Sequence, residues 1–364
     1  MIRAVLFTGD IFRQQPRGGI TRYIIEIARR LERPAEVVMG LHQSAEAAGL
    51  RVPLRAALRL PALRGVHRLA GPVNAVVDAC WLGSRRGVIV HPTYYRDPRG
   101  LPARAPMVVT VHDMTHERLP KFFPADRWDT WEPARYKAGL CRRADRILCN
   151  SETTRSDLLE LMDVPEAKVR LTPHASRDWS PVTPAPLERP EGPFVLWVGE
   201  RHAYKNFLPA LAAWAGCAEA AGTRLLCVGG GPFRPRERAA IDAAGVAARV
   251  FQRTVTDGEL RWAYEHARAL IHASLWEGFG VTLLEALDLG CPVLASDRPP
   301  FREVAGDAAV FAEPTDRDAL TDGLRAVLAQ SREPGQVARR RAQAVRFSWD
   351  TCATQHEAVY RELD

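Results

Sequence analysis

The chain of 364 residues has no apolar run that approaches the ~20 residues needed to span a bilayer. Its first apolar stretch, Ile2–Phe7, is too short for a signal peptide and is better explained as a buried opening strand. The seven cysteines are odd in number and form no Cys-x-x-Cys pair, which is typical of reduced, mostly buried thiols. We therefore expect a cytoplasmic protein without disulfides.

Three ligand-binding patterns are also missing. The glycines Gly229–Gly231 do not form a Gly-x-Gly-x-x-Gly motif, and no acidic ribose partner follows at the usual spacing, so a nicotinamide cofactor is not expected. His112 and His116 are four residues apart but lack an evident third ligand, so we expect no metal. Residues 51–70 contain arginines but no aromatic side chains for base stacking, which argues against a nucleic-acid partner.

The net charge of +7 is unevenly distributed. Residues 1–180 hold 29 Lys/Arg against 19 Asp/Glu (+10), whereas residues 181–364 hold 21 against 24 (−3). Arg51, Arg55 and Arg59 are four residues apart among leucines, and Arg64 and Arg68 follow them. This spacing predicts one face of a basic amphipathic helix, either touching an anionic inner-membrane surface or forming an ordinary solvated stripe.

Short apolar runs alternate with helical patterns in both halves, which predicts an α/β protein with parallel sheets and crossover helices. The expected strands are Ala4–Phe7, Glu36–Met39, Gly87–Val90, Met107–Val111, Arg146–Cys149, Lys168–Leu171, Phe194–Val198, Arg224–Val228, Arg249–Phe251, Ala269–His272, Pro292–Ala295 and Ala309–Phe311. The expected helices are Thr21–Leu31, Ser151–Met162, Phe207–Ala221, Asp257–Ala267 and Val281–Leu289.

The segment Ser180–Pro193 contains five prolines and marks the domain boundary. We expect an N-terminal Rossmann-like domain over residues 1–180, a linker over 181–193 and a second Rossmann-like domain over 194–345. Two doubly wound domains of this kind would face a central cleft, with ligands at the carboxyl ends of the strands.

Two acids, Glu277 and Glu285, flank a Gly-Phe-Gly turn and the start of an apolar helix. The backbone N–H groups and positive end of such a helix accept anions, and carboxylates accept hydrogen bonds from sugar hydroxyls. This combination is typical of a sugar-nucleotide site. Thr282 and Glu285 also have Thr-x-x-Glu spacing, so Glu285 could instead belong to a helix capping box.

Further polar residues follow the other expected strands of the second half. Gly199, Arg201 and Lys205 follow Phe194–Val198 at a helix start, where two cations can clamp a diphosphate. Gly229 opens a tight turn after Arg224–Val228, and Arg253 with Val255 follows Arg249–Phe251 as an expected base or ribose edge.

The first half offers two candidates. His112 and Asp113 follow the strand Met107–Val111, where ligand-facing polar groups belong, although a satisfied core histidine is the alternative. The loop Asp10–Thr21 ends in Gly18-Gly19 before a helix and predicts a nest for phosphate or acceptor, with a flexible connector as the alternative.

Taken together, these motifs resemble one family. Gly18-Gly19-Ile-Thr-Arg-Tyr23, Val111-His-Asp113, Asn150-Ser-Glu152, Gly199-x-Arg-x-x-Tyr-Lys-Asn206 and the Glu277/Glu285 segment occur in its order and spacing. The chain resembles bacterial glycosyltransferases of the GT-B fold in family four of the retaining enzymes, over nearly its whole length. Two segments depart from the family pattern, Pro173-His-Ala175 and Thr115-His-Glu117, at positions that concern the hinge and the acceptor.

The resemblance implies a role for each matched position. Glu277 would hold donor-sugar hydroxyls and Glu285 the ribose, while Arg201 and Lys205 would neutralise the diphosphate without a metal. His112 would lie over the donor sugar, with Asp113 orienting it or facing the acceptor. The remaining implied donor contacts are Gly19, Gly199, Gly229, Arg253, Val255, Gly278, Phe279, Gly280, Val281 and Thr282. The N-terminal domain, residues 1–180, would bind the acceptor, and the domain over 194–345 would bind the nucleotide sugar. The C-terminal segment 346–364 would cross back onto the N-terminal domain.

The resemblance further implies the reaction. We expect transfer of a hexose, with GDP-mannose as the first choice of donor and mannosyl- or rhamnosyltransferases as the most similar members. The basic N-terminal half fits a lipid-linked, lipopolysaccharide or exopolysaccharide acceptor at the cytoplasmic face of the inner membrane. A sugar-nucleotide epimerase on the same fold is the alternative, and it would react without an acceptor.

Overall fold

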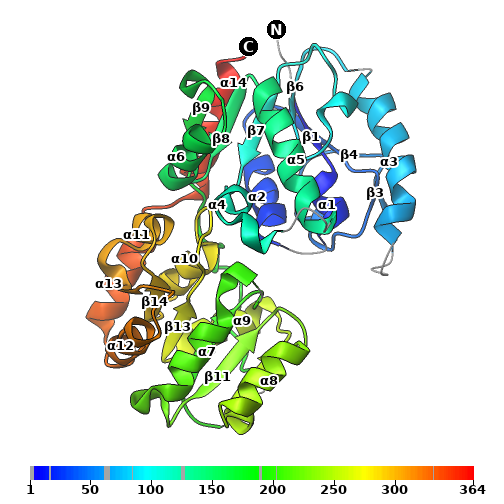
Figure 1. The fold of residues 1–364 in the computed structure, drawn as a ribbon. Helices are drawn as coiled ribbons and strands as arrows, with labels where there is room; N and C mark the ends of the chain where they lie inside the picture. Colours follow the sequence, from blue (N-terminus) through cyan, green and yellow to red (C-terminus); the bar gives the residue numbers. More distant parts are fainter. Residues whose placement is uncertain are drawn as a thin grey trace. The chain divides into compact units, whose positions relative to one another are not determined.

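The computed structural model describes residues 4–15, 18–60, 66–83, 85–123, 128–187, 191–201, 203–330 and 332–364. The chain divides into two compact units. The first comprises Met1–His174 with Ser348–Asp364, and the second comprises Ala175–Phe347. In this division the proline-rich segment 181–193 falls within the second unit. Figure 1 shows the chain coloured by sequence, from blue at the N-terminus to red at the C-terminus.

The first unit is built on parallel strands. β1 (Ala4–Thr8) lies between β2 (Ala35–Val38) and β6 (Val88–His91), in the order β4-β2-β1-β6. A bridge between Val90 and Met107 links β6 to the start of a second sheet, β7-β8-β9. The remaining strands are β4 (Leu54–Arg55), β7 (Val108–Val111), β8 (Arg146–Cys149), β9 (Val169–Leu171) and the separate pair β3 (Leu41–His42) and β5 (Leu58–Arg59).

Helices complete the first unit: α1 (Asp10–Gln14), α2 (Gly19–Ala28), α3 (Val66–Gly83), α4 (Thr115–Arg118), α5 (Trp128–Arg143), α6 (Glu152–Leu161) and the C-terminal α14 (Trp349–Arg361). α14 packs against α2 although more than 300 residues separate them, and Arg33 binds Glu357 at 2.9 Å beside that contact. The C-terminal helix is therefore part of the first unit.

The second unit contains one six-stranded parallel sheet in the order β12-β11-β10-β13-β14-β15. Its strands are β10 (Phe194–Val198), β11 (Arg224–Val228), β12 (Val250–Arg253), β13 (Ala269–His272), β14 (Val293–Ser296) and β15 (Val310–Ala312). The chain winds outward from β10 to β12 and then restarts at β13 on the other side of β10. In doubly wound sheets, ligands bind outside the carboxyl ends of the strands at this switch point.

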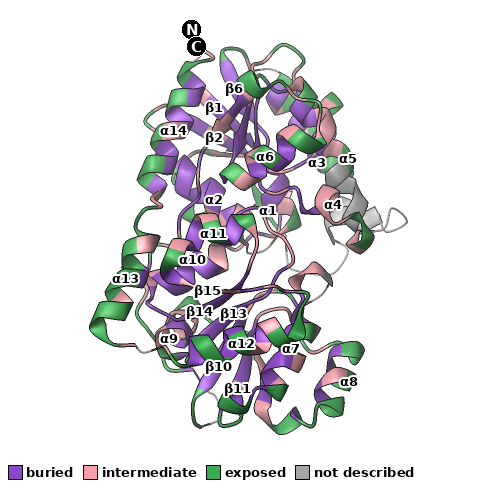
Figure 2. Cartoon of the chain, turned by 60° about the vertical axis from the view of Figure 1, so that its left-hand side comes forward, coloured by how far each residue is buried: buried purple, intermediate pink, exposed green. Residues whose placement is uncertain are grey.

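Helices cover both faces of that sheet: α7 (Phe207–Gly216), α8 (Pro235–Ala243), α9 (Asp257–His266), α10 (Val281–Asp288), α11 (Pro299–Ala305), α12 (Arg317–Leu328) and α13 (Pro334–Ala344). Alternate residues of β10 enter the two hydrophobic layers. Leu196 packs with Leu283 of α10, whereas Val195 and Trp197 pack with Trp214 of α7. The strands are consequently buried on both sides, as the burial colours of Figure 2 show.

These elements confirm the predicted α/β class and the two Rossmann-like units. Every predicted strand is present, with each end within two residues of its predicted position. The expected loop Asp10–Thr21 is corrected, because it contains α1 and because α2 begins at Gly19. None of the helices in the described part of the chain has the length and apolar character required to cross a membrane.

The predicted arginine-striped helix is wrong. Arg55 lies in β4 and Arg59 in β5, and Ala56 between them has a φ of +52°, which no helix allows. Arg51 precedes β4 and is exposed. Pairing of these short strands with β2 and β3 overrides the four-residue spacing. Arg64 lies outside the described residues, as does the side chain of Arg68.

Candidate functional site

A small cavity lies at the switch point of the second unit. Residues that follow β10 and β13 form most of its wall, so the loops after these two neighbouring strands create it. The lining residues are Trp197, Val198, Gly199, Glu200, Lys205, Ile271, His272, Ala273, Ser274, Glu277 and Thr282. Four of the predicted donor-site residues are therefore brought together, Gly199 and Lys205 from the segment after β10 and Glu277 and Thr282 from the segment after β13.

Glu277 is at the centre of this site. Its Oε1 accepts hydrogen bonds from Lys205 Nζ at 2.9 Å and Ser274 Oγ at 2.6 Å. Burial raises the pKa of Glu277, but the charges of Lys205 and His272 and these hydrogen bonds outweigh it and lower the pKa to about 2. Glu277 is therefore a fixed carboxylate at neutral pH, able to accept hydrogen bonds but poorly suited to take a proton.

His272 and Ser274 join Glu277 although the sequence analysis assigned them no role. His272 Nε2 is 3.3 Å from Glu277 Oε1, outside hydrogen-bond geometry, and the ring meets Phe301 edge-on at 4.8 Å. Burial lowers the pKa of His272 despite the opposing effect of Glu277. The sequence contained one signal for His272. It is the last residue of a buried strand, which places it at the carboxyl edge of the sheet.

The N-terminus of α10 borders the same cavity. Gly280 is its N-cap with a φ of +94°, and a Cβ there would approach the Phe301 ring to 3.1 Å, so both conformation and space require glycine. Phe279 is buried and packs edge-on against Phe347 at 5.4 Å. Gly278 precedes this anchored pair, and Val281 and Thr282 form the first turn, where backbone N–H groups attract anions.

The capping-box interpretation of Glu285 is wrong. Gly280 occupies the N-cap, so Thr282 is the second helical residue and makes no cap hydrogen bond. Glu285 is instead buried, and its Oε2 accepts a hydrogen bond from Tyr264 at 3.3 Å. Burial raises the pKa of Glu285 to about 7, although Arg177 and Tyr264 partly oppose the shift.

Arg201 does not line the cavity. Its guanidinium donates to the carbonyls of Gly229 at 2.8 Å and Gly231 at 2.6 Å, and its Nε lies 3.2 Å from Glu237 Oε2. Only 1% of this side chain is exposed. Arg201 therefore fixes the loop after β11, in which Gly229, Gly230 and Gly231 all have positive φ.

The remaining predicted donor residues follow the strand ends. Gly199 has a φ of +106° and donates its N–H to Val228 O at 2.9 Å. Gly229 donates to Arg253 O at 3.0 Å, and Val255 packs against the core beyond β12. These residues therefore share the carboxyl edge of the sheet with the cavity.

His112 and Asp113 follow β7 in the first unit. The His112 backbone is held on both sides, since its N–H donates to the Tyr95 hydroxyl at 3.2 Å and its carbonyl accepts from Asn150 Nδ2 at 2.8 Å. Its Nδ1 is buried and has no hydrogen-bond partner among the described residues. Burial lowers the pKa of His112 to about 4, with Asp113 opposing the shift, so the imidazole is neutral at pH 7.

Asp113 caps the turn that follows, accepting from the Thr115 N–H at 2.9 Å. Burial raises the pKa of this carboxyl, but Lys137, His116 and hydrogen bonds from Thr115 bring it below its ordinary value. The buried Lys137 donates to the Asp113 carbonyl at 2.9 Å and to Glu117 at 2.8 Å.

Tyr23 and His174 lie beside His112, and sequence reasoning missed both. Tyr23 meets the His112 ring edge-on at 5.3 Å and stacks on His174 at 4.5 Å. The Tyr23 hydroxyl lies 2.8 Å from Thr110 Oγ1 and 2.7 Å from His356 Nε2 of α14. The C-terminal helix thus supports the residues behind His112.

Gly19 begins α2, and a Cβ placed on it would meet no atom within 4 Å. The space above it is open, which the expected approach of a ligand requires. Arg55 is paired with Glu36 at 2.9 Å, whereas Arg51 and Arg59 are exposed.

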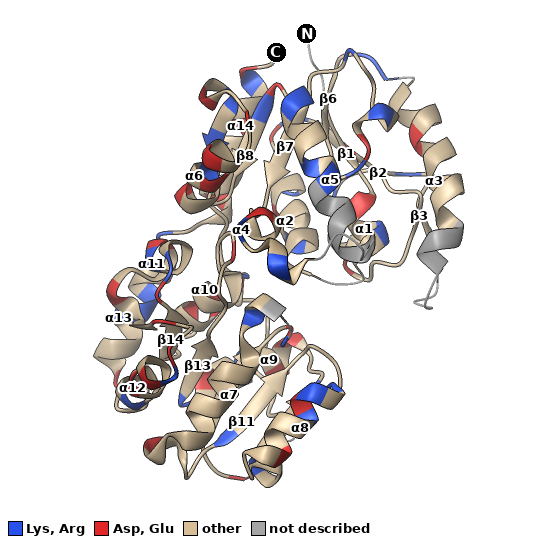
Figure 3. Cartoon of the chain, in the orientation of Figure 1, with Lys and Arg blue, Asp and Glu red and all other residues tan. Residues whose placement is uncertain are grey.

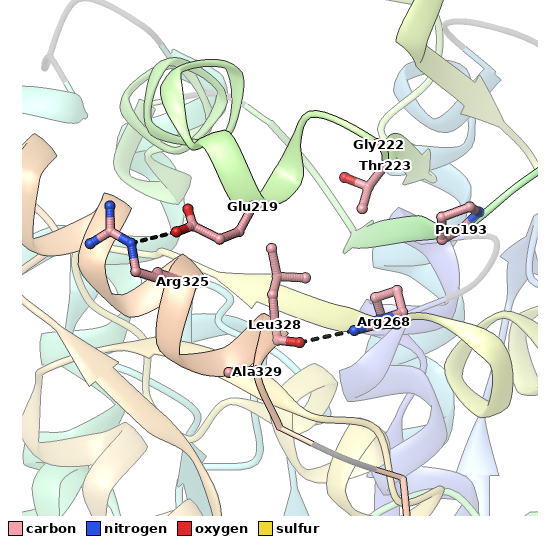
Figure 4. A pocket seen from close by; sticks show the side chains of 8 residues that line it. All are labelled: Pro193, Glu219, Gly222, Thr223, Arg268, Arg325, Leu328 and Ala329. Carbon is pink, nitrogen blue, oxygen red and sulfur yellow. Dashed lines mark hydrogen bonds and ion pairs between the residues drawn. The ribbon is translucent and has the colours of Figure 1, made fainter.

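A second pocket lies at the opposite, amino-terminal edge of the sheet in the second unit, and Figure 4 shows it. Pro193, Thr223 and Arg268 each immediately precede a strand. The charged groups there are paired, since Arg325 binds Glu219 at 2.8 Å and Arg268 donates to Leu328 O at 3.0 Å. Its position and its lining provide none of the groups found at the switch point. No group of three or more His, Cys, Asp or Glu residues suited to a metal occurs within the described ranges.

Comparison with known proteins places these sites in context. Residues 183–344 match the family model "Glycosyl transferases group 1", and residues 17–175 match "Glycosyltransferase Family 4". The chain is 28% identical to an O-antigen chain mannosyltransferase B of Escherichia coli, over 96% of this chain and 97% of that protein.

Solved structures share the fold. Sucrose-phosphate synthase from Thermosynechococcus elongatus superposes with a TM-score of 0.75 at 18% identity, covering 99% of both chains. WaaG, a glycosyltransferase involved in lipopolysaccharide biosynthesis, gives a TM-score of 0.71 at 19% identity, covering 98% of this chain and 99% of that one. At such identities the likeness concerns the fold alone.

Proposed function

The chain belongs to the GT-B glycosyltransferases of family four, and we propose that it is a retaining, metal-independent hexosyltransferase that uses GDP-mannose. One observation carries this proposal: a carboxylate, Glu277, is held ionised by Lys205 and Ser274 beside the N-terminus of α10 at the switch point. This arrangement offers acceptors for sugar hydroxyls and positive groups for phosphates within one small cavity.

In this proposal each donor-site group has a distinct task. Glu277 holds hydroxyls of the donor sugar, and Lys205 stabilises the diphosphate as negative charge builds on it. A preorganised group of this kind contributes about 3–4 kcal/mol to transition-state stabilisation. Glu285 receives the ribose. Arg201 acts indirectly, because its contacts with Gly229 and Gly231 keep the adjoining loop in place for the donor.

Glu277 positions the sugar and does not attack it. Its carboxylate is engaged by two donors and has a pKa of about 2, which suits neither a base nor an acid at neutral pH. The nucleoside diphosphate is already a good leaving group, so no strong acid is needed. We propose that its released phosphate takes the proton of the incoming hydroxyl on the same face, which retains the anomeric configuration.

His112 is proposed to bind the donor sugar as a neutral imidazole, with Asp113 either orienting His112 or facing the acceptor. Its unpartnered Nδ1 and depressed pKa support a hydrogen-bonding role without a positive charge. Gly19 leaves room for the ligand phosphates at the start of α2.

For the acceptor, we propose a lipid-linked or lipopolysaccharide glycan at the cytoplasmic face of the inner membrane. The support is the similarity to an O-antigen chain mannosyltransferase over nearly the whole chain. The relatives also favour transfer over the epimerase alternative.

Donor binding can be tested by thermal shift with GDP-, UDP-, dTDP- and ADP-sugars. We expect GDP-mannose to stabilise the wild-type protein most and Lys205→Ala to remove that stabilisation. Transfer is then measured with and without a lipid-linked acceptor. Stabilisation by none of the donors would overturn the donor assignment, and sugar conversion without acceptor would favour an epimerase.

A further inference from the structure

Helix α3 in the first unit presents an unusual surface to solvent. Over its residues 70–83, every exposed position is uncharged and lacks a hydroxyl or amide side chain. The exposed residues are Gly71, Pro72, Val73, Ala75, Val76, Ala79, Cys80 and Gly83. Val73 is 48% and Val76 64% exposed. Surface helices ordinarily place charged and polar residues on this side.

The two polar side chains of this segment point inward instead. Asn74 accepts from the Leu41 N–H at 2.7 Å and donates to the Leu41 carbonyl at 3.0 Å. Asp78 binds Arg13 at 2.8 Å and Arg96 at 2.7 Å. These contacts fix the rotation of the helix, so the apolar side is turned outward by buried polar anchors.

The apolar surface continues from α3 to a neighbouring strand. Leu41, the partner of Asn74, lies in β3, which pairs with β5 through Leu58. Leu58 is 58% exposed. Figure 3 draws the described length of α3 almost wholly in tan, which marks the scarcity of charged residues along it. We call the exposed residues of α3 together with Leu58 the α3 face.

The segments that precede and follow the α3 face in the sequence are rich in arginine. From Ala47 to Arg96, both included, there are eight arginines and a single acid, Asp78, which is buried. Arg85 and Arg55 lie over the Trp81 ring at 5.5 and 5.8 Å, at the end of α3, while Arg51, Arg59 and Arg86 are exposed. Glu36 pairs with Arg55 at 2.9 Å and with Arg85 at 3.0 Å, so the exposed positive charge of this stretch comes from Arg51, Arg59 and Arg86.

From these observations we infer that the α3 face docks onto the surface of an anionic lipid bilayer. Valine and leucine side chains enter the boundary between headgroups and acyl chains, and the bordering arginines contact lipid phosphates. A second copy of the chain fits less well, because a symmetric contact through this face would bring the two arginine-rich borders together. The inference rests on this surface and not on the donor site.

The test uses the full chain and vesicles of phosphatidylcholine with or without phosphatidylglycerol. We expect co-flotation with the anionic vesicles and weaker binding to the neutral ones. Val73→Gln/Val76→Gln should weaken binding about tenfold or more, because two exposed apolar side chains are lost from the contact. Leu161→Gln/Val345→Gln is the matched control, since both residues are exposed hydrophobics outside the α3 face.

The charge contribution is tested in the same assay. Arg51→Gln/Arg59→Gln should lower binding to anionic vesicles and leave the weak binding to neutral vesicles unchanged. The control is Arg339→Gln/Arg346→Gln, which removes two exposed arginines from the second unit. Equal losses in both pairs would show that net charge alone drives binding and would overturn the assignment to this face.

Cys80 supplies a direct probe of insertion, because it is exposed on α3 while the other six cysteines are buried. An environment-sensitive fluorophore on Cys80 should shift to shorter wavelength on anionic vesicles. Three outcomes would each overturn the proposal. The fluorophore could show no shift during binding, Val73→Gln/Val76→Gln could bind as strongly as wild type, or the protein could form a dimer that this variant disrupts. Thermal shift with GDP-mannose in the same variant separates this outcome from a failed donor assignment.

Discussion

Lys205 and Glu277 form a 2.9 Å ion pair across the cavity at the switch point, although they are 72 residues apart in the chain. The pair joins the loop after β10 to the loop after β13. The charge of Lys205 helps to keep Glu277 ionised, so the site already holds the groups that the proposed donor needs. This preorganisation avoids a rearrangement when the diphosphate begins to leave.

Glu277→Gln should lower kcat/KM for transfer by about a hundredfold or more, because the amide supplies a weaker acceptor and leaves Lys205 without its counter-charge. Steady-state kinetics with GDP-mannose measures the change. Glu313→Gln is the control, since Glu313 also has a pKa of about 2 and is paired with Arg298 but does not line the cavity. Wild-type turnover in Glu277→Gln would contradict the site assignment.

The Glu277 carboxylate should also stabilise the second unit in a pH-dependent way. Its folded-state pKa of about 2 is below the ordinary 4.5, so its contribution is present above pH 4.5 and is lost as the pH falls toward 2. The difference corresponds to about 3 kcal/mol in the free energy of unfolding. Denaturant unfolding of wild type and Glu277→Gln across this range should converge at low pH.

Arg201→Ala should destabilise the second unit by about 3–5 kcal/mol, because it leaves the buried Glu237 carboxylate unpaired and the glycine-loop carbonyls without a donor. Adding Glu237→Gln should restore part of the loss, which a double-mutant cycle measures. Lys205→Ala is expected to remove transfer while leaving the protein folded, with a loss of stability that comes from the unpaired Glu277 carboxylate. Equal stabilities for Arg201→Ala and wild type would contradict the loop-fixing role.

The strands could be predicted because buried parallel strands such as Phe194–Val198 form continuous apolar runs, and polar residues just after them fall at one edge of a sheet. Side-chain contacts between residues that are far apart in the sequence could not be predicted. Nothing local indicates that His356 reaches Tyr23, or that Arg201 turns toward Gly229. The four-residue arginine spacing failed because strand pairing decided that segment.

The local sequence signal for a helix N-terminus also gave a wrong prediction at Glu285. The Thr-x-x-Glu spacing indicates a capping box, but Gly280 already begins the helix in a left-handed conformation that other residues rarely adopt. Glu285 therefore lies one turn inside the helix, where tertiary neighbours such as Tyr264 and Arg177 determine its environment.

Glu285 should make donor affinity depend on pH near neutrality. Its pKa of about 7 means that the carboxyl is half ionised there, and the ionised form is the stronger acceptor for ribose hydroxyls. We expect the Kd for GDP-mannose to fall between pH 6 and pH 8, by isothermal titration calorimetry, and Glu285→Gln to abolish the change. A pH-independent Kd in the wild type would contradict the ribose role.

Stability should respond to Glu285 with the opposite sign from Glu277. Its folded pKa is raised above 4.5, so its contribution is fully present below pH 4.5 and is lost as the pH rises through about 7. The cost of ionising it in the folded protein approaches about 3 kcal/mol above that pH. Glu285→Gln should therefore be more stable than wild type at pH 8 by chemical denaturation, with little difference at pH 4.5.

The histidines behind the His112 site should make the first unit sensitive to acid. Burial lowers the pKa of His356 to about 4, as it does for His112, from an ordinary 6.5. For a histidine with a depressed folded pKa, the stabilising contribution is present above pH 6.5 and is lost as the pH falls toward 4.

This acid sensitivity can be assigned to one residue. Between pH 6.5 and 4, wild-type protein should lose up to about 3 kcal/mol for each of these histidines, and His356→Gln should lose correspondingly less. Glutamine cannot titrate but can still hydrogen-bond the Tyr23 hydroxyl. Denaturant unfolding followed by tryptophan fluorescence measures the slope, and His266→Gln is the control on the second unit. Equal slopes for His356→Gln and wild type would show that the network binding α14 to Tyr23 does not titrate in this range.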